Sequence, residues 1–288
     1  MNISNKIKKY ITKKKEGNQV KKFLLDNNLD ILKADKSKQL IIVYSDWIKK
    51  KKYDLVESEK FRLLPIDPKE VIQKELKNRI TKLQKLNKLT KQEKEFILND
   101  NNDRTPKINI HLKTHKPGDK VRPIIDFKNS PLYNLEKFLK QQLKQFQNST
   151  FTIMNTDELL HDIKKLKIER NMKIASLDIT DMYPSMTWDI IEPKLMKLNV
   201  EPEIINLIEF AYKSNYFEYE GNYYTQEEGI SMGSVIGPKL AELNSVIFLR
   251  GCCGISLNLY GDIAEFDETV MEAFQDLLRT VTEALRIR

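Results

Sequence analysis

Residues 176–186 read SLDITDMYPSM, and the interpretation of the whole chain starts from this stretch. Residues 172–177 are mostly apolar, which predicts a short buried strand that ends beside Asp178. An ionised carboxylate at the end of such a strand is costly unless a partner compensates its charge. Carboxylates are natural ligands of Mg²⁺, so a metal ion is one candidate partner. The alternative is that Asp178 only caps the turn that precedes Pro184, where any regular element must stop.

A second carboxylate falls at the tip of a predicted hairpin further along the chain. Residues 255–260 alternate apolar and polar side chains, as a half-buried strand does, and Gly261 and Asp262 form a turn. Residues 263–266 can return antiparallel to that strand. Two Mg²⁺ ions held by converging carboxylates form a site for phosphoryl transfer. Asp178 and Asp262 are therefore candidate catalytic residues and metal ligands.

A basic hairpin is predicted upstream of both carboxylates. Residues 108–112 and 121–127 are candidate strands, and the Pro-Gly pair between them favours a turn. Its cationic side chains are Lys113, Lys116, Lys120 and Arg122. A guanidinium suits bidentate binding of phosphate, and lysines add point charges, so this hairpin is a candidate for holding a triphosphate. A basic surface hairpin without a ligand is the alternative.

Residues 228–237, EGISMGSVIG, are rich in glycine. Glycine has no Cβ, so such a segment allows the backbone to approach a ligand closely. Pro238 suits the first position of a following helix, which Gly251 is expected to end. Just upstream, residues 216–225 predict a hairpin centred on Gly221 and Asn222.

The remaining segments mostly show the apolar spacing of amphipathic helices, and together with the strands they predict an α+β fold. Besides residues 40–44, which predict a strand, the expected elements are a short helix within residues 1–35 and helices at 46–53, 71–89, 91–98, from 130 onward, 156–166, 187–198, 202–212 and 270–285.

Composition excludes several classes of protein. The chain has 288 residues, of which 40% are hydrophobic and 31% charged, so it can build a core and keep a polar surface. It has no apolar run long enough to span a bilayer and no signal peptide. Its two cysteines are adjacent, and its three histidines show no zinc-site spacing. These features predict an intracellular protein, nuclear or cytoplasmic, with no membrane partner; they leave the oligomeric state open.

The net charge of +8 is unevenly distributed. Residues 1–120 carry 31 Lys and Arg against 16 Asp and Glu, whereas the rest of the chain carries 18 against 25. A basic half beside an acidic half suits a protein that holds a polyanion in one part and metal ions in the other. The alternative is a lysine-rich solvated surface that follows from an AT-rich coding sequence.

Taken in order, these motifs resemble those of reverse transcriptases of the Penelope-like element type. LDITDMY resembles the first palm motif of that family, ISMGSVIGP the second and LYGD the third. KTHKPGDKVRPIIDFKNSPLYNLEKFL is similar to the family's Lys-x-His-Lys-Pro-Gly segment with its later Arg-Pro-Ile, and ILKADKS, LIIVY and FRLLPIDP resemble its N-terminal fingers signature. The resemblance covers residues 30–265, and the order of the motifs makes it specific.

The resemblance implies a right-hand polymerase fold, with an antiparallel palm sheet packed on helices. On this basis the chain divides into a basic leader at residues 1–29, a fingers-like region at 30–150 and a palm-like region at 151–288. Asp262 lies so close to the C-terminal end of this chain that we expect the thumb to be missing. The endonuclease domain of many family members is also expected to be absent.

The resemblance also assigns roles to single residues. Asp178 and Asp262 would bind two Mg²⁺ ions, for which Mn²⁺ is a substitute, with help from the backbone carbonyl of Ile179. Tyr183 would stack under the sugar and exclude a 2′-hydroxyl, and the other expected contacts of the dNTP are Lys113, Lys116, Arg122, Gly233 and Ser234. Tyr260 and Gly261 are the neighbours of Asp262 in the third motif.

One departure from the family pattern leaves two hypotheses open. The family's third motif is Tyr-x-Asp-Asp, but here Ile263 follows Asp262, and an apolar side chain cannot bind metal. The first hypothesis is an RNA-directed DNA polymerase that extends a DNA primer on an RNA template from dNTPs. The second is a truncated or decayed copy of the fold that only binds nucleic acid.

Overall fold

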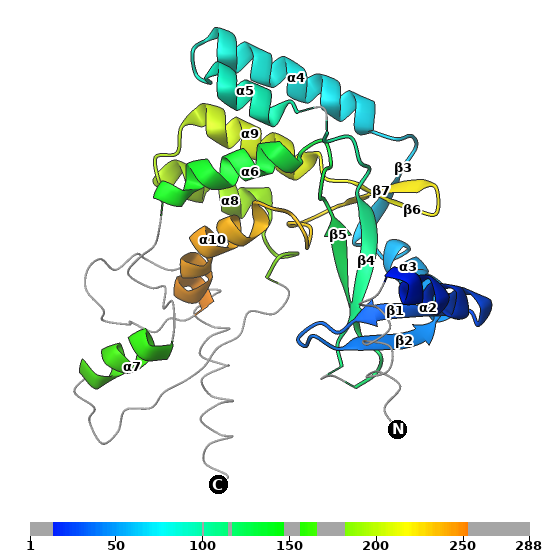
Figure 1. Ribbon diagram of the computed structural model, residues 1–288. Coiled ribbons are helices and arrows are strands. Elements are labelled where there is room, and N and C mark those ends of the chain that lie inside the picture. Colours follow the sequence, from blue (N-terminus) through cyan, green and yellow to red (C-terminus); the bar gives the residue numbers. More distant parts are fainter. Residues whose placement is uncertain (1–13, 100, 115–116, 147–155, 166–181, 253–288) are drawn as a thin grey trace.

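The structure is a computed structural model that describes residues 14–99, 101–114, 117–146, 156–165 and 182–252. Within these residues it combines helices with a five-stranded sheet and a two-stranded sheet, which confirms the predicted mixture of α and β elements (Figure 1). The strands predicted around Asp178 and Asp262 and the helix predicted at 270–285 lie outside the described residues.

The two-stranded sheet lies at one end of the molecule, beside helices α2 (Lys14–Asp26) and α3 (Ser45–Val56) (Figure 1). Strands β1 (Leu29–Lys33) and β2 (Leu40–Tyr44) pair antiparallel, with Ile31 opposite Ile42. The predictions of β2, of α3 and of a helix near the N-terminus are confirmed. The sequence interpretation did not include β1, whose alternation extends over only five residues.

The five-stranded sheet has the order β3-β7-β6-β4-β5, and it joins distant parts of the chain. Its strands are β3 (Phe61–Leu64), β4 (Lys107–Leu112), β5 (Val121–Asp126), β6 (Phe217–Tyr219) and β7 (Asn222–Gln226). The β4–β6 pair is parallel and the other pairs are antiparallel. The sheet is therefore mixed, and it contains strands from both sides of residue 150.

Both predicted hairpins within the described residues are present. In β4–β5, Ile108 lies opposite Ile125 and His111 opposite Arg122, so Arg122 is the second residue after the turn. In β6–β7 the two turn residues are Glu220 and Gly221, both with positive φ, as the favoured two-residue turns require. The turn is thus one residue earlier than predicted.

The remaining helices agree with the predicted segments apart from their ends. They are α4 (Lys69–Lys85), α5 (Lys91–Ile97), α6 (Tyr133–Gln142), α7 (Thr156–Lys165), α8 (Trp188–Lys197), α9 (Pro202–Lys213) and α10 (Gly237–Cys252), and the short 3₁₀ turn η1 (Leu143–Gln145) follows α6. Helix α6 begins after Ser130, because the Tyr133 amide closes a turn onto the Ser130 carbonyl. The prediction that Gly251 ends α10 was wrong, since the helix continues to Cys252.

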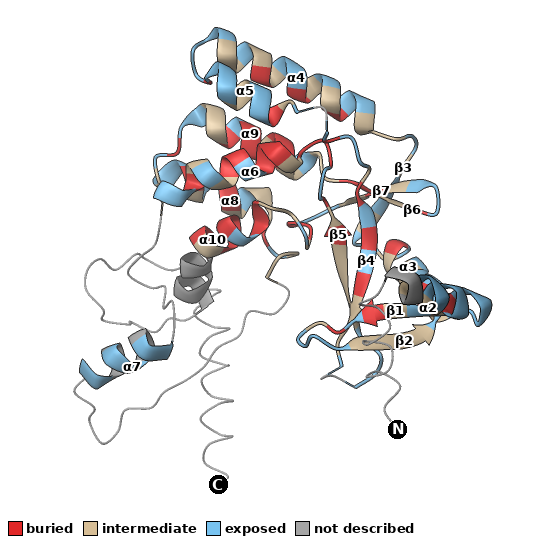
Figure 2. Ribbon diagram, in the orientation of Figure 1, coloured by how far each residue is buried: buried red, intermediate tan, exposed pale blue. Residues whose placement is uncertain are grey.

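The main core lies between the helices, where Figure 2 places most of the buried residues of α6, α8, α9 and α10. Its side chains without measurable exposure include Leu135, Leu139, Ile191, Leu195 and Leu243. Each contributes about 1.5–3 kcal/mol by leaving water. A second cluster packs on the sheet, where the Phe217 ring stacks on Tyr224 and meets the edge of Phe61. These two cores fix where the loops between them lie.

Candidate functional site

Three of the motif-like segments meet at one place in the structure. The Ile230 amide donates to the Tyr183 carbonyl at 2.8 Å, which joins the end of the first segment to the second. The Ile125 amide of β5 donates to the Met232 carbonyl at 2.7 Å, which joins the second segment to the basic hairpin. Backbone hydrogen bonds therefore hold together segments that lie far apart in the sequence.

Two glycines make these close approaches feasible. Gly229 has φ +75° and Gly233 has φ +121°, in the region that L side chains rarely adopt. A Cβ on Gly229 would overlap the Pro184 carbonyl, and one on Gly233 would overlap the carbonyl of Ile125. The atoms that an added Cβ would meet at these two glycines belong to the protein's own backbone, and the predicted approach of this segment to a ligand stays a prediction.

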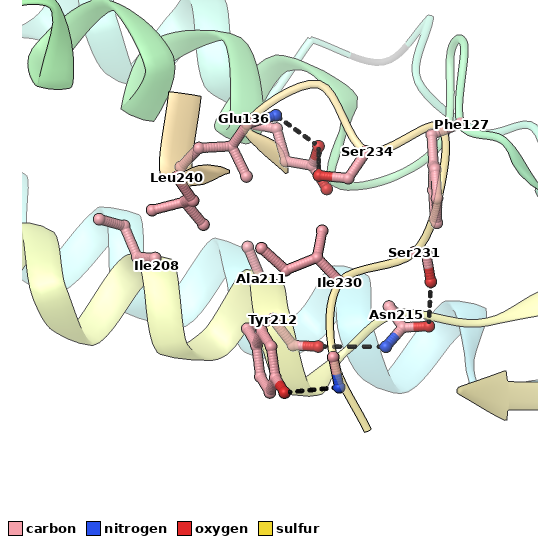
Figure 3. A pocket seen from close by; sticks show the side chains of 12 residues that line it. Phe127, Glu136, Ile208, Ala211, Tyr212, Asn215, Ile230, Ser231, Ser234 and Leu240 are labelled. Atoms are coloured by element: carbon pink, nitrogen blue, oxygen red, sulfur yellow. Dashed lines mark hydrogen bonds between the residues drawn. The ribbon is translucent and has the colours of Figure 1, made fainter. Parts of the chain in front are cut away.

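Polar side chains of α6, of α9 and of the loop after α9 hold residues 228–237, with Glu136 in the upper part of Figure 3 and Tyr212 and Asn215 in the lower part. The Gly229 amide donates to the Tyr212 hydroxyl at 3.0 Å, and the Ser231 hydroxyl donates to the Asn215 side-chain oxygen at 3.0 Å. Burial raises the pKa of Tyr212, so its hydroxyl stays protonated. The small cavity between these groups has a volume of about 20 Å³, which suits a single water molecule.

The carboxylate of Glu136 holds the other end of this segment. It accepts hydrogen bonds from the Ser234 hydroxyl at 2.9 Å and from the backbone amides of Val235 at 2.5 Å and Ile236 at 3.2 Å. Only 4% of Glu136 is exposed, and burial raises the pKa of its carboxyl while the three hydrogen bonds lower it. The sequence interpretation missed this residue.

A signal for Glu136 was present in the sequence. Leu132, Leu135, Glu136 and Leu139 follow the i, i+3, i+4, i+7 spacing of a buried helix face, and Glu136 takes a place that an apolar residue should occupy. An acidic residue on a buried stripe requires hydrogen-bond partners inside the protein. The sequence alone does not indicate that these partners lie at the start of α10.

Beside this junction lies a larger cavity of about 530 Å³, within the range of small-molecule sites. Two of the predicted phosphate-binding residues, Lys113 and Arg122, line it together with Pro184 and Met232. Its remaining walls are largely apolar, from Leu55, Phe61, Val121, Pro123, Ile125 and Ile230. The basic hairpin thus shares this cavity with Pro184 and Met232, which are next in sequence to Tyr183 and Gly233.

Tyr183, Gly233 and Ser234 lie at this junction with different exposures. Gly233 is exposed, Ser234 is half-buried, and the Tyr183 ring lies half-buried against the helical core and Gly237. Their predicted contacts with a nucleotide stay predictions.

Arg122 is already paired in the structure. Its guanidinium lies 2.9 Å from the carboxylate of Asp35, of which 3% is exposed. The backbone after β1 runs beside the end of β4, where the Asp35 amide donates to the Leu112 carbonyl and so places the carboxylate below the hairpin. Among the described residues, neither the second Asp35 oxygen nor the Arg122 Nε has a hydrogen-bond partner. Sequence reasoning did not foresee this ion pair.

The charge of the large cavity is balanced. Lys60, Lys113 and Arg122 line it together with three acids, Glu59, Glu227 and Glu228. Glu227 is paired with Arg62 of β3, and Arg122 with Asp35. An anion bound here would therefore depend on Lys60, on Lys113 and on the guanidinium edge that faces away from Asp35.

The other predicted site residues, namely Lys116, Asp178, Ile179, Tyr260, Gly261 and Asp262, lie outside the described residues. Within the described ranges, no group of three or more His, Cys, Asp or Glu residues could hold a metal ion. The predicted magnesium site thus falls on residues of which the structure gives no account.

The chain matches no model of a known protein family and no curated protein. In the part of the chain that the structure describes, none of the helices has both the length and the apolar character needed to cross a membrane.

Proposed function

We propose that the chain is the fingers and palm of an RNA-directed DNA polymerase. The observation that carries the proposal is the backbone junction at Ile230 and Met232. It brings the end of the first motif-like segment and the basic hairpin together around the second segment. A nucleotidyl-transfer site needs these parts side by side, because catalysis of phosphoryl transfer consists mainly of positioning and electrostatic stabilisation.

In this proposal the large cavity takes the incoming dNTP. Lys113, Lys116 and Arg122 hold the triphosphate, and the largely apolar wall accommodates the sugar and base. Tyr183, whose carbonyl is fixed by Ile230, packs under the sugar and disfavours a 2′-hydroxyl. Gly233, which is exposed next to Met232 of the cavity wall, and Ser234 would contact the nucleotide where it extends out of the cavity towards α10.

Asp178 and Asp262, with the Ile179 carbonyl, would hold two Mg²⁺ ions. Oxygen donors of this kind are the ligands that Mg²⁺ prefers. When bound, the two ions activate the primer 3′-hydroxyl and neutralise charge on the leaving pyrophosphate. The protein's own part is to keep Asp178 next to the segment that ends at Tyr183 and Pro184, and to orient the triphosphate from the hairpin side.

The test is extension of a DNA primer on an RNA template with Mg²⁺ and dNTPs. We expect incorporation by the wild type and its loss in Asp178→Ala. Asp54→Ala is the matched control, because Asp54 is an exposed residue of α3 and does not line the cavity. Incorporation at equal rates in all three proteins would refute the proposal.

A second function is favoured by Ile263, which stands where the family's second metal-binding aspartate is expected. In this case the fold binds RNA through its basic N-terminal half but does not catalyse incorporation. RNA binding by the wild type and Asp178→Ala, with incorporation by neither, would identify it. The balanced charge of the cavity agrees with a weak nucleotide site in such a protein.

A further inference from the structure

Glu136 is a buried acid for which the described residues supply no cation. Its three hydrogen-bond partners are the Ser234 hydroxyl and the amides of Val235 and Ile236, at the point where α10 begins. An ionised carboxylate out of water is costly, and among the described residues these donors and the positive end of the α10 dipole offset the cost. Such a costly arrangement needs an explanation beyond packing.

The position of the three hydrogen-bond partners of Glu136 provides such an explanation. Residues 228–237 are held at two ends by different elements. At Gly229 and Ser231 the anchors are neutral side chains, Tyr212 and Asn215. At residues 234–236 the anchor is Glu136, whose single oxygen Oε2 receives all three bonds. Charged acceptors form stronger hydrogen bonds than neutral ones, so Glu136 fixes this end more tightly.

We propose that Glu136 is a positioning residue for the nucleotide. It acts through Ser234 and the adjoining backbone, and this inference rests on the proposed function, in which Gly233 and Ser234 line the dNTP. Glu136 itself, at 4% exposure, does not touch the substrate. Its removal frees the α10 end of the segment, while the Gly229 end stays attached to Tyr212 and Tyr183.

The first test is amide hydrogen exchange in the full chain, which needs no activity. In Glu136→Gln we expect exchange to become at least about tenfold faster at residues 235 and 236, whose amides donate to Glu136, because charge-assisted bonds are replaced by weaker ones. Exchange at residues 229–231 should stay as in the wild type. Glu201→Gln is the matched control, since Glu201 is exposed and its side chain makes no capping bond.

The second test separates binding from chemistry in the primer-extension assay. Glu136→Gln should raise the KM for dNTP about tenfold and change kcat less than about threefold, because one neutral-for-charged hydrogen-bond exchange corresponds to about that ratio. Ser234→Ala should also raise the KM for dNTP. The double variant should raise the KM for dNTP by less than the product of the two single increases, because both changes break the same hydrogen-bond network.

The outcomes are distinct. Unchanged exchange at residues 235 and 236 in both Glu136→Gln and Glu136→Ala would overturn the positioning role. Uniformly faster exchange along 228–237 would also overturn it, since the residue would then be only a general stabiliser. If the wild type incorporates no nucleotide, the proposed function fails, and the exchange pattern alone still decides whether Glu136 positions the segment. With an active wild type, an unchanged KM in Glu136→Gln would refute the link to the nucleotide.

Discussion

The junction of the three segments has two sides, one at α10 and one at the β4–β5 hairpin. Their buried polar groups differ in how many hydrogen-bond partners they have. On the α10 side, the carboxylate of Glu136 receives three hydrogen bonds, and Tyr212 and Asn215 bond the rest of the glycine-rich segment. On the hairpin side, Arg122 meets Asp35 through one contact, and a buried atom of each lacks a partner among the described residues. Among the described residues, the groups named on the first side all have partners, whereas the second retains unused hydrogen-bonding capacity where an anion would bind.

The largest effect is expected from breaking the ion pair. Arg122→Ala leaves the Asp35 carboxylate buried and uncompensated, which should lower the free energy of unfolding by about 3 kcal/mol. Urea denaturation followed by circular dichroism measures the loss. Adding Asp35→Asn to Arg122→Ala should recover part of the stability, because the buried charge is then gone. A double variant no more stable than Arg122→Ala would show that Asp35 does not depend on this pair.

A smaller effect is expected from the glycines of the α10 side. Gly229→Ala and Gly233→Ala each place a Cβ against a neighbouring carbonyl at a residue with positive φ. Each should lower the free energy of unfolding by about 2–3 kcal/mol. Gly118→Ala is the matched control, because Gly118 also has positive φ but its Cβ would meet open space. It should cost only about 1 kcal/mol. Equal losses in thermal denaturation would contradict the close approach.

The smallest effect concerns the pH dependence of Glu136. Burial raises the pKa of its carboxyl above the ordinary value of 4.5, so the folded state binds more protons than the unfolded state between these two pH values. The contribution of Glu136 to stability is therefore largest in acid and is lost as the pH rises through the folded-state pKa. Relative to Glu136→Gln, the wild type should therefore lose stability as the pH rises from 4.5 towards neutrality.

The measurement is the urea concentration at the midpoint of unfolding, determined for both proteins across that pH range. A difference that stays constant with pH would show that the carboxyl is not perturbed by burial.

Local pattern predicted most of the described helices and both described hairpins. The apolar stripes of α4 and α9 and the Gly221 turn are local features, so no knowledge of the fold was needed. Strands β1 and β3 were missed for a physical reason. Each is only four or five residues long, and β3 becomes a strand by pairing with β7, which lies far along the chain.

The residues of the candidate site also divide into those that the sequence indicated and those that it did not. Lys113 and Arg122 could be found from their charge and Gly233 from its residue type, and the structure brings them to one region. Asp35 and Glu136 could not be placed, because an acid becomes informative only when its burial and its partners are known. Both pairings are set by tertiary packing between elements distant in sequence.

The most direct test of the account is single-nucleotide addition to a DNA primer paired with RNA, measured as elongated primer after one turnover. We predict addition by the wild type that requires Mg²⁺, and at least about a thousandfold slower addition when Asp178 or Asp262 is replaced by Ala. Addition by both alanine variants at the rate of the wild type would contradict the account.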